Sequence, residues 1–144
     1  KGLSSPVGSL IVGKEHFITK AKKIRKALGG GMRQAGILAA AGIFSFNNMI
    51  NRLEEDHENA QLLACKLSEI SNLSVSPAMV KTNIIFIHLK NTKLSDEEFL
   101  VKINKNNIKI DYKGNRKFRL VTHCDFQKSA IDTIVSSIAN IIKE

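Results

Sequence analysis

The sequence lacks several features that would point directly to a class of protein. Its 144 residues include only two cysteines, Cys65 and Cys124, whose spacing fits neither a disulfide framework nor a pair of metal ligands. We expect both thiols to be reduced, which favours a cytoplasmic protein. No secretory signal is visible, and the longest apolar run, 35–46, is shorter than the ~18 residues that a membrane helix requires. The sequence therefore argues against a metal site, a disulfide-rich scaffold and a membrane protein.

Acidic residues are also scarce: 13 Asp and Glu stand against 22 Lys and Arg, so the net charge is +9. A basic chain can bind nucleic acid. Here no zinc motif or RNA-binding aromatic signature accompanies the charge, so we favour a solvated helix face and expect no nucleic-acid partner. The charge concentrates on one predicted helix, at Lys14, Lys20, Lys22, Lys23, Arg25 and Lys26.

What is present is typical of a soluble globular domain, with 43% hydrophobic and 24% charged residues. In the first half, the pattern predicts a strand over 7–13 and a helix over 14–28 that Gly29, Gly30 and Gly31 end. These glycines could bind a phosphate before the next helix, but a plain helix-to-helix turn is the commoner role. A second helix, 33–46, is apolar on nearly every side and must be buried against another layer or subunit. A long helix over 49–70 follows.

The second half predicts a small, mainly antiparallel sheet with helices on one face. Strands are expected at 73–76, at 83–90 as a central strand, at 108–113 and at 118–123, with a turn at 114–116 between the last two. Ser95 and Glu98 form a capping box that starts a helix to about 104. We expect Asp125 to cap the last helix, whose buried stripe is Ile131, Ile134, Ile138 and Ile141.

The opening residues are unusual. Lys1 is followed by Gly2, which lets a bulky ligand approach, and Pro6 stiffens the exit from the loop. A lysine presented in this way suits a Schiff base, although a lone N-terminal lysine is far more often solvated and inert.

Five sequence segments, considered together, decide between a Schiff-base lysine and a solvated one. The segments KGLSSPVGS (1–9), GGGMRQAGILAAAG (29–42), RLEEDHENA (52–60), KTN (81–83) and RLVTH (119–123) occur in this order across nearly the whole chain. Together they resemble the low-specificity L-threonine aldolase family, and the second and last segments are the most specific. The resemblance implies a partial α/β fold of the PLP-dependent transferase type (fold type I). Residues 1–48 would be the tail of the large, cofactor-binding domain, and 49–144 a long connecting helix with a small α+β C-terminal domain.

The resemblance also implies the site. Lys1 would be the catalytic lysine that carries pyridoxal 5'-phosphate (PLP), and Lys26 and Arg33 match family positions that line the cofactor region. Arg119 would bind the α-carboxylate of the substrate, since a planar guanidinium can form two parallel hydrogen bonds to it. The general base is not identifiable, and we expect no metal.

The implied activity is retro-aldol cleavage of threonine, allo-threonine and related β-hydroxy-α-amino acids to glycine and an aldehyde. We expect a lyase that is inactive without the N-terminal part of the same enzyme and that forms a homodimer or homotetramer. Two alternatives stay open: another fold-type I PLP enzyme acting on amino acids, and a basic nucleic-acid-binding module.

Overall fold

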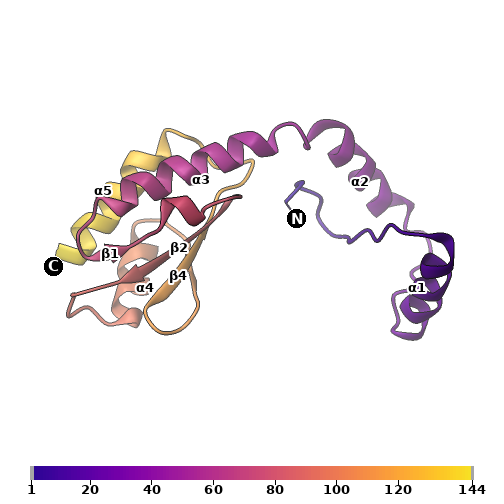
Figure 1. Cartoon of the computed structure of the whole chain (residues 1–144), viewed down its shortest axis with the longest axis horizontal. Helices are drawn as coiled ribbons and strands as arrows, with labels where there is room; N and C mark the ends of the chain where they lie inside the picture. Colours follow the sequence, from indigo (N-terminus) through magenta and orange to yellow (C-terminus); the bar gives the residue numbers. More distant parts are fainter. Residues whose placement is uncertain (1, 144) are drawn as a thin grey trace. The chain divides into compact units, whose positions relative to one another are not determined.

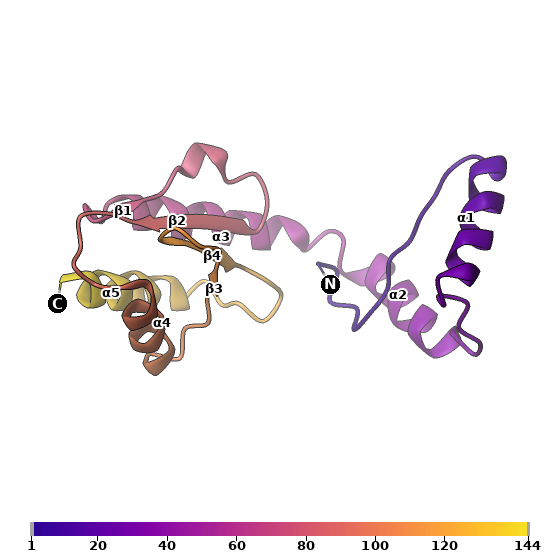
Figure 2. The ribbon, with the colours of Figure 1, turned by 90° about the horizontal axis from the view of Figure 1, so that it is seen from below.

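The structure is a computed structural model that describes residues 2–143. Its internal contacts divide the chain into two compact units, Lys1–Asn51 and Arg52–Glu144 (Figures 1 and 2). The division into domains expected from the sequence, 1–48 and 49–144, stays a prediction about the complete fold.

The first unit contains two helices, α1 (Glu15–Ala27) and α2 (Gly36–Asn48). The predictions of helices at 14–28 and 33–46 are therefore confirmed, with their ends shifted by up to three residues. The predicted strand over 7–13 is wrong, because these residues belong to no strand. A strand needs a neighbour to accept its backbone hydrogen bonds, and no other segment within residues 2–143 pairs with this one.

The glycine run ends α1 as a helix cap. The Gly30 amide donates to the carbonyl of Arg25 over 2.8 Å, and the Gly29 amide donates to that of Lys26 over 3.1 Å. This pair of bonds is the Schellman arrangement, and Gly29 takes the positive φ of 81° that it requires. A Cβ at Gly30 would lie only 3.2 Å from the Arg25 carbonyl oxygen, so the loop needs glycine there as well. Since the two amides are already engaged, they are not available to a phosphate.

The apolar side chains of the first unit are largely exposed. The structure describes every residue of α1 and α2, and among them only Ser45 is buried. Ile37 is 85% exposed and Leu28 is 82% exposed. That the apolar helix is buried against another layer or subunit stays a prediction, since within this chain its apolar side chains are largely uncovered.

The second unit begins with α3 (Leu53–Ser68) and contains a four-stranded antiparallel sheet in the order β1-β2-β4-β3. The strands are β1 (Leu73–Ser74), β2 (Ile84–Leu89), β3 (Asp111–Tyr112) and β4 (Lys117–Val121), and a short 3-10 helix, η1 (Pro77–Met79), follows β1. Helices α4 (Asp96–Lys105) and α5 (Ala130–Lys143) complete the unit. Figures 1 and 2 show the three helices gathered against the sheet. The predicted antiparallel α+β arrangement is confirmed.

The core lies on the helical side of the sheet. Along β2, Ile85, Ile87 and Leu89 are buried while Ile84 and Phe86 are exposed, and along β4 Phe118 and Leu120 point to the same buried side. The Phe99 ring of α4 packs edge-on against that of Phe118, with 4.9 Å between ring centres. The other sheet face is open within this unit and is available for function.

The hairpin between β3 and β4 reverses at Gly114, Asn115 and Arg116, all of which have positive φ. Positive φ is unfavourable for arginine. The Arg116 side chain offsets that cost by donating hydrogen bonds to the carbonyls of Leu89, Thr92 and Leu94, each 3.2 Å long. The predicted turn is confirmed, and Arg116 fastens it to the loop that precedes α4.

Two further predictions can be compared at the level of residues. The capping box is confirmed, since the Ser95 hydroxyl accepts from the Glu98 amide and the Glu98 carboxylate accepts from the Ser95 amide. These hydrogen bonds from Ser95 hold the pKa of Glu98 below its usual value. Asp125 does not cap α5, which begins five residues later. Its backbone amide instead donates to the Nδ1 atom of His123.

A Phe→Ala substitution should lower the free energy of unfolding more on the buried face of the sheet than on the open face. Replacing Phe118, which is fully buried, with alanine should destabilise the protein by about 3–5 kcal/mol, because the lost ring leaves a cavity. Phe86→Ala, on the open face of the neighbouring strand, should cost less than ~1 kcal/mol. Chemical denaturation of both variants measures the difference, and equal losses would contradict the assignment of the core.

Candidate functional site

Arg119 lies in the middle of β4 on the open face of the sheet. The register places it directly opposite Phe86 of β2 on one side and Asp111 of β3 on the other. Directly opposed residues in an antiparallel pair share a face, so these three side chains form a row across the sheet. The Arg119 side chain is 37% exposed. The arginine predicted from the sequence is therefore accessible, on a rigid strand.

The carboxylate of Asp111 is the acceptor for two cations. Its Oδ2 atom lies 2.7 Å from Nη2 of Arg119 and 2.6 Å from Nζ of Lys113. The Lys113 hydrogen bond, and then the Arg119 charge, hold the pKa of the Asp111 carboxyl below its usual value of 3.8. Asp111 is therefore ionised at neutral pH and orients the guanidinium. The sequence does not single out Asp111, because its contact with Arg119 depends on the pairing of β3 with β4.

The guanidinium of Arg119 retains capacity for another ligand. Its Nε atom is buried and has no hydrogen-bond acceptor within residues 2–143. An unpaired buried donor is costly, and arginine characteristically binds a carboxylate through two parallel hydrogen bonds. Because Nε is buried and Asp111 engages Nη2, a carboxylate ligand would have to bind through Nη1 and the second N–H of Nη2.

The remaining predicted site residues belong to the first unit. Lys26 lies in the last turn of α1 and Arg33 between the glycine run and α2, and both side chains are exposed. Neither has an ion pair among the residues that the structure describes. Lys1 lies outside the described residues, so its place stays a prediction.

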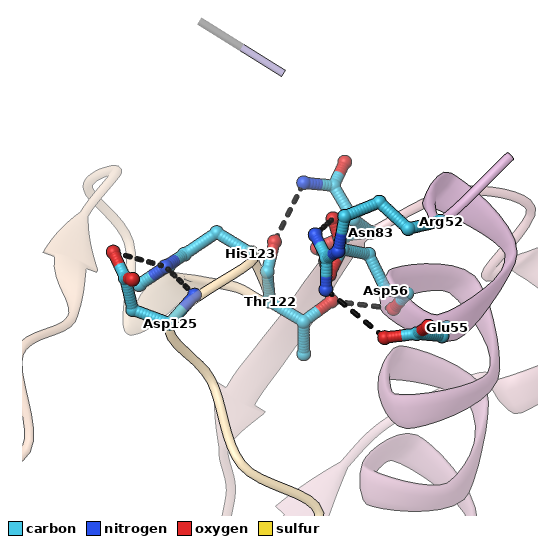
Figure 3. Close-up of polar contacts among 7 residues, drawn as sticks. All are labelled: Arg52, Glu55, Asp56, Asn83, Thr122, His123 and Asp125. Atoms are coloured by element: carbon cyan, nitrogen blue, oxygen red, sulfur yellow. Dashed lines mark hydrogen bonds and ion pairs between the residues drawn. The ribbon is translucent and has the colours of Figure 1, made fainter. Parts of the chain in front are cut away.

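A buried corner joins three separate parts of the second unit just beyond Arg119 (Figure 3). The Thr122 hydroxyl donates to the backbone carbonyl of Asp56, in the first turns of α3, over 2.6 Å. The Asn83 side-chain amide donates to the Thr122 carbonyl over 2.7 Å, and the Thr122 amide donates to the Asn83 carbonyl over 3.0 Å. These bonds secure the end of β4 to both β2 and α3. Sequence reasoning assigned Asn83 and Thr122 no role. It predicted a solvated helix face for Asp56 with Glu54 and Glu55, which is wrong for Asp56, because that residue is buried.

The carboxylate of Asp56 is buried at the same corner. The Arg52 guanidinium lies 3.4 Å from each of its oxygens and 3.1 Å from Glu55 (Figure 3). Burial lowers the pKa of Arg52, but the carboxylates of Asp56 and Glu55 outweigh that effect and raise it. Oδ1 of Asp56 has no hydrogen-bond partner in the described part of the chain, so the long contacts to Arg52 leave the carboxylate only partly satisfied.

His123, Cys124 and Asp125 follow this corner, and their potential metal-ligand atoms lie within 4.8 Å of one another. The Nδ1 atom of His123 already accepts a hydrogen bond of 3.2 Å from the Asp125 amide (Figure 3). A metal at Nδ1 would have to displace that bond. Three consecutive, partly exposed residues of this kind give no reason to assign a metal.

Comparisons with known proteins now identify the family. The family model described as "Beta-eliminating lyase" matches residues 1–91. The chain belongs to this family. It is 38% identical over 137 residues to "Low-specificity L-threonine aldolase 1" of Arabidopsis thaliana, covering 94% of this chain and 38% of that protein. It is also 38% identical over 136 residues to "Low specificity L-threonine aldolase" of Escherichia coli (strain K12), covering 94% of this chain and 39% of that protein. The chain thus spans about two fifths of the length of these relatives.

Solved structures share the fold. A protein from Exiguobacterium sp. 255-15, assigned as an aromatic amino acid beta-eliminating lyase/threonine aldolase, superimposes with a TM-score of 0.74 at 13% identity, covering 98% of this chain and 42% of its own. A protein from Listeria monocytogenes EGD-E, assigned as an L-allo-threonine aldolase, gives 0.71 at 18% identity, covering 99% and 42%. These likenesses confirm the expected fold-type I class. Separately, none of the helices within residues 2–143 is long and apolar enough to cross a membrane.

Enzymes of this family generally depend on PLP. Lys26 and Arg33 are exposed cations without an ion-pair partner among residues 2–143, and their charge suits the phosphate dianion of PLP. That they hold the cofactor stays a prediction. The glycine amides that cap α1 do not contribute, since they are already hydrogen-bonded.

The hydroxyl of Thr122 in the buried corner should contribute to the free energy of unfolding. Thr122→Val keeps the shape of the side chain but removes its hydrogen bond to the Asp56 carbonyl, which still accepts a helical amide, so the free energy of unfolding should fall by about 0.5–1.5 kcal/mol. Thr122→Ser, which keeps the hydroxyl, should lose less. Denaturant titration of both variants checks this, and a smaller loss for valine than for serine would be incompatible with the hydrogen bond being important.

Proposed function

We propose that this chain is the C-terminal portion of a PLP-dependent low-specificity L-threonine aldolase. The substrates would be threonine, allo-threonine and related β-hydroxy-α-amino acids, and the products glycine and an aldehyde. Family membership and the two relatives described above support this assignment. The observation that carries it is the presentation of Arg119: its side chain is 37% exposed on the open sheet face, and its ion pair among residues 2–143 is with Asp111 through Nη2.

The chain would supply three kinds of group to the reaction. Lys1 would attach the cofactor, and Lys26 and Arg33 would neutralise its phosphate. When bound, PLP supplies an electron sink for the charge that develops at Cα. Arg119 would bind the α-carboxylate of the substrate and so fix its orientation. The base that removes the β-hydroxyl proton is not assigned to any residue of this chain.

The N-terminal portion that the relatives possess would complete the enzyme. The exposed apolar surface of α1 and α2 supports this, because side chains such as Ile37 and Phe44 need a covering layer. That layer would come from the N-terminal portion and from a second copy, in a homodimer or homotetramer. We expect a cytoplasmic enzyme, because the spacing of Cys65 and Cys124 in the sequence does not fit a disulfide framework.

The experiment uses the complete enzyme, that is, this chain together with the N-terminal portion. Wild-type enzyme should bind PLP with a visible absorbance band and convert threonine and phenylserine to glycine and the corresponding aldehyde. Lys1→Ala should abolish the band that depends on covalent attachment. Arg119→Lys should keep the band but raise KM at least about tenfold, since lysine cannot form two parallel hydrogen bonds.

Absorbance spectra and product analysis distinguish this proposal from a related PLP enzyme. Products other than glycine and aldehyde, with an intact band, would show that a sister enzyme cleaves another bond. An unchanged band in Lys1→Ala would refute the assignment of the cofactor lysine.

A further inference from the structure

The contact between Arg119 and Asp111 is built into the register of the sheet. The two residues are opposed across the β3–β4 ladder, so their side chains emerge side by side on the open face. Arg116 fastens the turn between the two strands by three hydrogen bonds to backbone carbonyls, which supports this register. The Asp111 contact is therefore a fixed feature of the face that carries Arg119.

The hydrogen bonds divide the guanidinium into a held part and an available part. Asp111 accepts from Nη2, and Nε is buried, so neither of these two N–H groups can bind a ligand from solvent. A guanidinium has five N–H donors, so both N–H groups of Nη1 and the second N–H of Nη2 are left for a second carboxylate. A long side chain that is 37% exposed would otherwise sample several rotamers, and ordering it would reduce the affinity for a ligand.

Lys113 affects the net charge around Arg119. Asp111 alone would neutralise the positive charge of Arg119, and that charge is what attracts an anionic ligand. Lys113 shares the same Oδ2 atom of Asp111, so the group of two cations and one carboxylate keeps a net charge of +1. The nearby Lys117 ammonium lies 4.3 Å from the centre of the Phe86 ring and adds positive charge to this face.

We propose that Asp111 and Lys113 form a positioning pair for Arg119: Asp111 holds the guanidinium in the orientation that binds the α-carboxylate, and Lys113 offsets the charge of Asp111. The pair touches no reacting atom and acts through Arg119. This inference rests on the proposed function, because it assigns these two residues to the carboxylate subsite of the same enzyme.

The test is steady-state kinetics of variants in the complete enzyme. Asp111→Ala should raise KM for threonine about tenfold while kcat changes less than about twofold, because only the binding of the carboxylate is affected. The inhibition constant of glycine should rise in parallel, since glycine presents the same carboxylate. Lys113→Met should raise both values as well, because Asp111 then neutralises Arg119. In Asp111→Ala/Lys113→Met, the effects should be less than additive.

A matched control removes a comparable ion pair elsewhere. Asp132 of α5 pairs with Lys66 of α3, away from the open sheet face. Asp132→Ala should leave KM, kcat and glycine inhibition unchanged. The PLP absorbance of every variant shows that the cofactor site is intact.

The outcomes separate this inference from the proposed function. If Arg119→Lys weakens threonine and glycine binding but Asp111→Ala leaves both within twofold, the positioning role is refuted and the function stands. If Asp111→Ala lowers kcat and PLP content without changing KM, the residue is merely structural and the inference also fails. If Arg119→Lys itself changes neither KM nor glycine inhibition, the carboxylate subsite is wrong and the inference is overturned together with the function's central observation.

Discussion

The pairing of β2 with β4 is the constraint on which the second unit depends. It places Phe118 and Leu120 in the core and Arg119 on the opposite, open face. Because side chains alternate along a strand, a shift of one residue would bury the guanidinium and expose the phenyl ring. The core and the candidate site are therefore two consequences of one register. Burial of the apolar side chains on one face stabilises the register, and that register keeps the charged side chain on the other face.

The ends of this register are secured by hydrogen bonds rather than by packing. At one end, Thr122 links β4 to Asn83 and to the start of α3. At the other end, Arg116 fastens the hairpin turn to the loop before α4. Both residues lie within a few positions of Arg119. An arginine that has to recognise a planar carboxylate benefits from this support, since orientation as well as charge decides the strength of the interaction.

The sequence predicted most of the second unit because its signals are local. The alternation around Phe118 and Leu120, the capping box at Ser95 and the glycine turn each act within a few residues. The prediction of a strand over 7–13 failed because a strand also depends on a neighbour, and none is available within residues 2–143. The cap assigned to Asp125 failed because its backbone amide bonds to His123 instead.

The candidate site was predicted only where a family motif names a residue. Arg119 could be found in this way, whereas Asp111 and Lys113 could not, because their role depends on a cross-strand contact. The same limit applies to the buried corner. The family segments include Thr122, Asn83 and Asp56, but only the fold shows that Thr122 contacts the other two. Contacts between distant residues are what a single sequence leaves undetermined.

The central claim is that the open face of this sheet binds an amino-acid carboxylate through Arg119. A crystal structure of the complete enzyme with PLP and glycine tests it most directly. The account predicts that both carboxylate oxygens of glycine accept hydrogen bonds from the Arg119 guanidinium while Asp111 remains on Nη2. A structure in which other groups hold the glycine carboxylate, with Arg119 turned away from it, would contradict the account.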